Sequence, residues 1–176
     1  MNKKSTIRTD ELTGKRYLCI AEGSSPQAAL NDIISNHRKK LTECNKEMFR
    51  QRYDCTVNIT ELYGNSNYCP ADNAGYRLIE INEVEDLDGS KCGTVLAKTE
   101  SGSYATWQYT FFPKEDFFNG FNKGNYFNNE LAAVADYHKR SAERAERIAE
   151  QWAKRNSSTL NDSEHSIDNE DMEMEI

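Results

Sequence analysis

The stretch SSPQAALNDIISNHRKKLTECNKEMFRQRY, residues 24–53, decides the fold that we predict. Ser25 can cap the free N–H groups of a first helical turn, and Pro26 suits the first helical position because its missing N–H is not needed there. Apolar and semi-apolar side chains then recur at steps of four and three residues, at Leu30, Ile34, His37, Leu41, Cys44 and Met48, with Ile33 widening the stripe. The sequence therefore predicts one long helix over residues 24–53, whose apolar stripe another element must cover.

Strands are predicted on both sides of this helix. Residues 15–22, KRYLCIAE, are apolar on both faces, which indicates a central strand. Residues 53–63 alternate between apolar and polar side chains, which is typical of a half-buried strand. Three further strands, at 76–84, 91–99 and 104–112, are separated by short turn sequences and form a predicted antiparallel meander.

A short helix, a loop and a long helix are predicted after the meander. Residues 114–121 can form a short helix, and 119–129 read as a loop of Asn, Gly and aromatic residues. A long helix follows over 130–155, with an Ala-rich seam at Leu131, Ala135, His138, Ala142, Ala145, Ala149 and Trp152. We expect this seam to be covered by the sheet, by the first helix or by a second copy of the chain.

These elements indicate an α+β fold with an antiparallel sheet of about five strands, in the order β-α-β-β-β-β-α. The chain has 22 Lys and Arg against 29 Asp and Glu, and seven of the acids lie in residues 156–176, which contain no base. Ordering that segment would cost more chain entropy than its few apolar groups return. We therefore predict a flexible basic arm at 1–14, a single domain at 15–155 and a disordered acidic tail at 156–176.

The cysteines and the N-terminus indicate a cellular compartment. Five cysteines are an odd number and form no CxxC pair, which is typical of reduced thiols. The first residues lack the apolar run of a signal peptide, and no window reaches the 18 or so apolar residues of a membrane span. We expect a cytoplasmic protein that does not enter a membrane.

Signs of catalysis are weak. His37 and His138 lie on the two helical seams and could share a metal or a proton, and Cys69 in a loop could act as a nucleophile. The simpler interpretation is that both histidines are packed seam residues and that Cys69 is an ordinary thiol, because no spacing supplies carboxylate or thiolate partners. We expect no metal and no cofactor, and we lean away from an enzyme.

Aromatic residues are the better candidates for binding. Trp107, Tyr109 and Phe111 alternate on one strand face, where they are either a stacking platform for single-stranded nucleic acid or the core face of the sheet under the long helix. The core interpretation is favoured because this face is the most apolar on the strand. The candidate binding residues are Trp107, Tyr109, Lys123, Tyr126, Phe127 and Trp152.

The last 21 residues add one resemblance. Their acids, together with Met172, Met174 and Ile176 at the end, are similar to the C-terminal tails of single-stranded DNA-binding proteins, which implies recruitment of partners. Acidic tails more often serve solubility or repel anions. Our first hypothesis is a non-enzymatic protein-binding protein, an accessory or inhibitory factor, with a homodimer through the last helix as one option. The alternatives are a single-stranded nucleic-acid-binding module and a small enzyme using His37 and His138.

Overall fold

The computed structural model describes residues 2–35 and 46–167. Its helices and antiparallel strands make an α+β protein, as predicted. Contacts divide the chain into two compact units, unit 1 at Met1–Leu78 and unit 2 at Ile79–Ile176, where the sequence predicted one domain over 15–155. We describe each unit by itself.

The sheet of unit 1 contains three antiparallel strands in the order β1 (Asn2–Thr9), β2 (Arg16–Gly23) and β3 (Cys55–Glu61). The central position predicted for β2 is confirmed. Strand β1 lies where we predicted a flexible arm. Its side chains are mostly exposed, so it is held by a backbone ladder to the edge of β2, which an apolar pattern cannot indicate.

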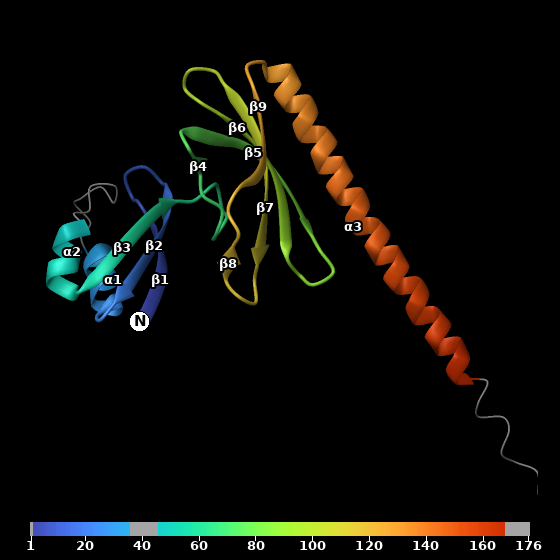
Figure 1. Cartoon of the computed structure of the whole chain (residues 1–176). Helices are drawn as coiled ribbons and strands as arrows, with labels where there is room; N and C mark the ends of the chain where they lie inside the picture. Colours follow the sequence, from blue (N-terminus) through green and yellow to red (C-terminus); the bar gives the residue numbers. More distant parts are fainter. Residues whose placement is uncertain (1, 36–45, 168–176) are drawn as a thin grey trace, which may run out of the picture. The chain divides into compact units, whose positions relative to one another are not determined.

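Two helices, α1 (Pro26–Ser35) and α2 (Lys46–Tyr53), share the core of unit 1 with the sheet (Figure 1). The prediction of one helix is wrong. The Tyr53 hydroxyl donates to the Asp32 carboxylate at 2.7 Å, whereas 21 residues of a continuous helix would separate the two by roughly 31 Å. The predicted stripe positions His37, Leu41 and Cys44 lie outside the described residues. The core cluster comprises Tyr17, Cys19, Ala21, Ala29, Leu30, Ile33, Phe49, Cys55 and Val57.

Charged side chains close the end of strand β3. Arg77 donates to both carboxylate oxygens of Glu61, and Lys15 Nζ lies 3.3 Å from the same carboxylate. The Arg77 guanidinium is the main reason that the pKa of Glu61 lies below its usual value, with Lys15 contributing in the same direction. Arg77 follows β4 (Asp72–Asn73), a two-residue strand inside the segment we predicted as a loop.

The second sheet has the order β4-β5-β6-β7-β8, and β9 also pairs with β7. The predicted meander is present as β5 (Tyr76–Glu85), β6 (Lys91–Lys98) and β7 (Tyr104–Phe112). The second edge of β7 is shared by β8 (Phe117–Phe118) and β9 (Asn122–Phe127). These strands replace the predicted short helix and loop, since pairing with β7 satisfies backbone groups that the local sequence leaves open.

The long helix α3 (Glu130–Ile167) lies against β6, β7 and β9 and continues past them (Figure 1). The side chain of Asn129 caps its first turn by accepting a hydrogen bond from the Ala132 amide at 3.1 Å. The helix extends through residues 156–167, where we predicted the start of a disordered tail. Within the described ranges, no helix has both the length and the apolar composition of a bilayer span.

Candidate interaction surface

The inner face of α3 is partly polar. Ala133, Tyr137 and Ile148 are buried, and the first two belong to a cluster with Leu96 of β6 and Tyr104 of β7. Ser141 and Arg144 are buried on the same face. Arg144 holds this face to the sheet by hydrogen bonds, in addition to the apolar contacts.

Two side chains tie the first half of α3 to β7 and β9. Asp136 accepts hydrogen bonds from the Thr106 hydroxyl and from the Asn125 amide. Arg140 donates to the Thr106 hydroxyl at 2.8 Å and to the Lys123 carbonyl. Because the four side chains come from three elements, these bonds fix the rotation of the helix about its own axis.

Arg144 makes the deepest of these contacts. Its side chain is 7% exposed, and its guanidinium donates to the Gly93 carbonyl at 3.0 Å, to the Tyr109 carbonyl at 3.1 Å and to the Thr110 hydroxyl at 3.2 Å. A buried cation needs such partners because it loses its water shell. Arg144 thus sets the position of α3 along β6 and β7.

The predicted Ala-rich seam lies on a different face of α3, and every one of its residues is exposed. Leu131 is 80% exposed and Trp152 44%. At 100° per residue, the centre of this seam is roughly 110° around the helix from the buried face. Of the three covers that we expected for this seam, the sheet is excluded, because the polar side chains of the inner face turn α3 onto a neighbouring face. We call the seven residues from Leu131 to Trp152 the exposed seam.

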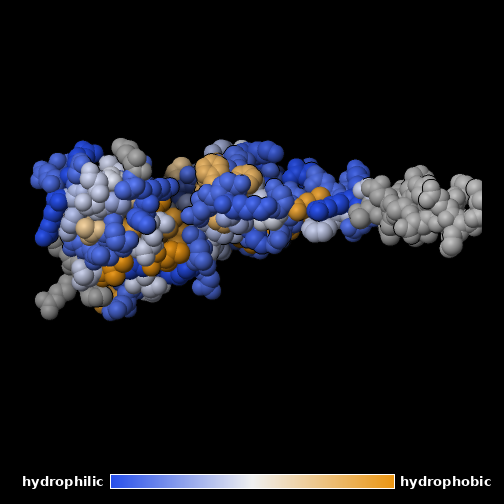
Figure 2. Space-filling view, turned by 90° about the horizontal axis from the view of Figure 1, so that it is seen from below, coloured by the Kyte–Doolittle hydropathy of each residue, from blue (hydrophilic) through white to orange (hydrophobic). Residues whose placement is uncertain are grey.

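Charged side chains flank one side of the exposed seam. Lys139 and Glu146 follow seam positions His138 and Ala145, and both are exposed. Lys139 Nζ lies 3.9 Å from Glu143 on the next turn. The surface of α3 seen in Figure 2 is mostly hydrophilic with a small hydrophobic area. An apolar stripe within a charged helix surface is the usual pattern of a helix that pairs with another helix.

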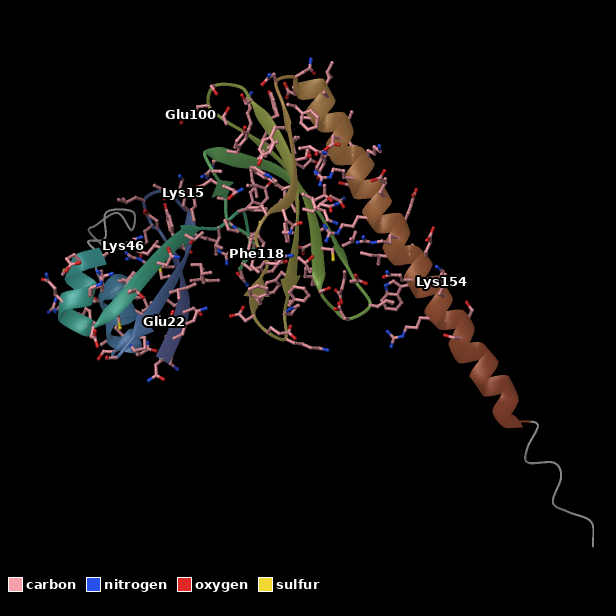
Figure 3. All side chains as sticks on the ribbon, viewed as in Figure 1. Lys15, Glu22, Lys46, Glu100, Phe118 and Lys154 are labelled. Carbon is pink, nitrogen blue, oxygen red and sulfur yellow. The ribbon has the colours of Figure 1, made fainter. Side chains whose placement is uncertain are left out.

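The aromatic candidates on β7 are not on the surface. Trp107 and Tyr109 are 3% and 1% exposed, on the sheet face opposite to α3. Phe121 packs against both rings, with centroids 5.6 and 6.0 Å away, and Phe118, labelled in Figure 3, packs against Tyr109 at 5.1 Å. The predicted core role of the two residues agrees with their burial, although the covering side chains come from β8 and the following turn rather than from the long helix.

The other predicted binding residues are dispersed. Tyr126 of β9 is 63% exposed and meets the Trp107 ring edge-on, and the exposed Lys123 lies three residues before it. Phe127 points to the opposite face and packs against the cluster under α3. Trp152 belongs to the exposed seam. The structure brings Trp107, Tyr109 and Tyr126 into one aromatic cluster and separates Phe127 and Trp152 from it.

The predicted catalytic candidates do not meet among the described residues. Cys69 is buried in unit 1, and its amide donates to the Ser66 hydroxyl at 3.0 Å. His138 is exposed on α3 and packs edge-on against the Tyr137 ring. His37 lies outside the described residues. In residues 2–35 and 46–158, where side chains are described, no cluster of three His, Cys, Asp or Glu could hold a metal ion.

A shallow groove of about 670 Å³ lies in unit 1. Glu22, Arg50 and Asp54 contribute charges of both signs to its lining, and Asp54 accepts a hydrogen bond from the Ser24 hydroxyl. Cys55 also lines the groove, and the Ser24 hydroxyl lies there beside the Asp54 carboxylate.

Sequence reasoning missed several residues that shape these surfaces. Phe118 and Phe121 cover the aromatic pair of β7, and Gly124 leaves room for the Trp107 ring, since an added Cβ would lie 2.8 Å from its indole nitrogen. The sequence signal for Phe118 and Phe121 is the frequency of aromatic residues in this part of the chain, which we assigned to a helix and a loop. Lys139 and Glu146 were passed over because their role depends on which face of α3 is exposed.

Comparison with protein-family models, with curated protein sequences and with solved structures finds no match to this chain.

Proposed function

We propose that this chain is a non-enzymatic protein-binding protein, and that its contact surface is the exposed seam of α3. One observation carries the proposal. The seven heptad-spaced residues of the exposed seam face away from the sheet, while a separate, partly polar face of the same helix makes the contacts with the sheet. An unpartnered amphipathic helix face is a common protein-binding element.

The dimensions of the seam suit a helical partner. From Leu131 to Trp152 it extends roughly 32 Å along the helix, about the length of six turns. Alanine at four of its seven positions lets a second helix approach to the short end of the usual 8–10 Å between helix axes. Leu131 and Trp152 at its ends provide the large apolar groups, and tryptophan is frequent among residues that dominate binding energy.

Nucleic-acid binding has less support from the same observations. A stacking platform requires exposed rings, whereas Trp107 and Tyr109 are buried. On α3, Arg140 and Arg144 are bound to the sheet, and the exposed bases Arg147 and Lys154 each lie one turn from an acid, Glu143 or Glu150, so that acids share this side of the helix with the bases that phosphate binding would need.

Site-specific photo-crosslinking tests the proposed function. We place a photoreactive amino acid at Ala145, on the seam, or at Glu150, which is exposed on the charged side of α3, and irradiate the full chain in a lysate of the cells that make it. We expect adducts with another protein molecule from position 145 and none from position 150, because only the seam is in close contact.

Three outcomes would contradict the proposal. They are an absence of adducts from position 145, equal adducts from both positions, and an adduct within the same chain, which would show that the seam is covered internally. Circular dichroism of both variants establishes beforehand that they fold like the unmodified protein.

A further inference from the structure

The exposed seam carries a charge pattern that identifies its partner. In heptad positions, Leu131, His138, Ala145 and Trp152 are d residues, Ala135, Ala142 and Ala149 are a residues, and Lys139 and Glu146 are e residues. In an antiparallel helix pair, a residues face d residues of the other helix and e residues face e residues. The chain thus has one cation and one anion at the e positions beside its seam.

We propose that the exposed seam binds a second copy of this chain, as an antiparallel helix pair in which Ala142 faces Ala145 of the other copy. This inference rests on the proposed function and names its partner. In this register Lys139 of each copy lies beside Glu146 of the other, so that the two-fold symmetry makes two identical attractive pairs.

The size of the seam side chains favours the same register. Trp152 faces Ala135 of the second copy, and His138 faces Ala149, so that these two large side chains each meet a methyl group, while Leu131 lies at the end of the pair opposite Asn156. The centre contains only alanine, where the helices are closest. This alternation of large and small residues is what close packing of two helices requires.

Other arrangements lose the charge match. A shift of one heptad in either direction places Lys139 beside Lys139 or Glu146 beside Glu146, which is repulsive. A parallel pair places e residues beside g residues, which are Val134, Ser141 and Ile148, and stacks His138 on His138. Only the antiparallel register centred between Ala142 and Ala145 pairs opposite charges.

Charge exchange tests the register. We measure dimer dissociation constants of the full chain by sedimentation equilibrium for the wild type, for Lys139→Glu and for Glu146→Lys. Each variant makes both cross-copy pairs repulsive. We expect the dissociation constant to rise roughly tenfold, because two exposed pairs that are weakly attractive become weakly repulsive. An equimolar mixture of the two variants restores opposite charges in both pairs and should form a heterodimer with about the wild-type affinity.

The matched controls are Lys154→Glu and Glu150→Lys, which make the same charge changes at exposed positions away from the seam. They should leave the dissociation constant unchanged. A wild type that stays monomeric at its highest soluble concentration would refute the second copy as partner, and variants that fail to complement each other would refute the register. If the purified protein is monomeric but position 145 still crosslinks in the lysate, the proposed function stands and the partner is a different protein.

Discussion

Replacing Arg144 by alanine should lower the free energy of unfolding of unit 2 by about 3 kcal/mol, because the guanidinium's hydrogen bonds to two backbone carbonyls and one hydroxyl are lost in a buried place. Both tryptophans of the chain, Trp107 and Trp152, belong to unit 2, so that urea denaturation followed by tryptophan fluorescence reports on this unit. Arg144→Lys should recover only part of the loss, since an ammonium cannot reach both carbonyls in a planar fork.

Arg147 provides the matched control, because it lies three residues further along the same helix and is exposed. Arg147→Ala should change the unfolding free energy by less than about 0.5 kcal/mol. Equal effects of the two alanine variants would contradict the placement of α3, and with it the separation of the buried face from the exposed seam.

The second large effect is expected in unit 1. Ile33 is 2% exposed and Ile34 is 40% exposed, although the two residues are adjacent on α1. Ile33→Ala should cost about 3 kcal/mol, within the range for removing buried methyl groups, and Ile34→Ala less than about 1 kcal/mol. Amide hydrogen exchange in β2, the central strand of this unit, measures both. A larger effect at Ile34 would contradict the packing of α1.

The same pair of isoleucines shows where sequence reasoning reached its limit. The predicted stripe followed a single helix through Ile34, and Ile33 was only an addition to it. The bond between Tyr53 and Asp32 brings α1 and α2 onto one core, and it is Ile33 of α1 that belongs to that core. Periodicity identifies an amphipathic helix, but tertiary packing decides which of two adjacent residues is covered.

Most of the predicted strands have buried side chains on at least one face. β2, β3, β6 and β7 have buried side chains, and their sequences alternate or are apolar throughout. The side chains of β1 and β9 are mostly exposed, and each strand is held by backbone pairing along the edge of another. Their polar sequences resemble those of loops. Only the presence of a neighbouring strand distinguishes such an edge strand from a loop.

The candidate surface was predicted as a seam, but the sheet, one of the three covers expected for it, does not lie over it. The spacing of Leu131, Ala142 and Trp152 led us to expect a covered face. The face that is covered instead contains Ser141 and Arg144, which a hydropathy pattern would assign to solvent. Arg144 donates hydrogen bonds to carbonyl groups on two strands. The sequence of the helix alone therefore does not indicate that Arg144 is buried.

Trp152 is a built-in probe for the pairing of α3 with a second copy through the exposed seam. Trp107 is buried, so that acrylamide quenching of the free protein should act mainly on Trp152, the last residue of the seam. We expect Trp152 to be readily quenched in dilute protein and protected at high concentration, over the range in which sedimentation shows the mass doubling, because it then packs against Ala135 of the second copy. Trp152→Phe should remove the concentration-dependent component. Equal quenching of Trp152 at every concentration would contradict the pairing of two copies through the exposed seam.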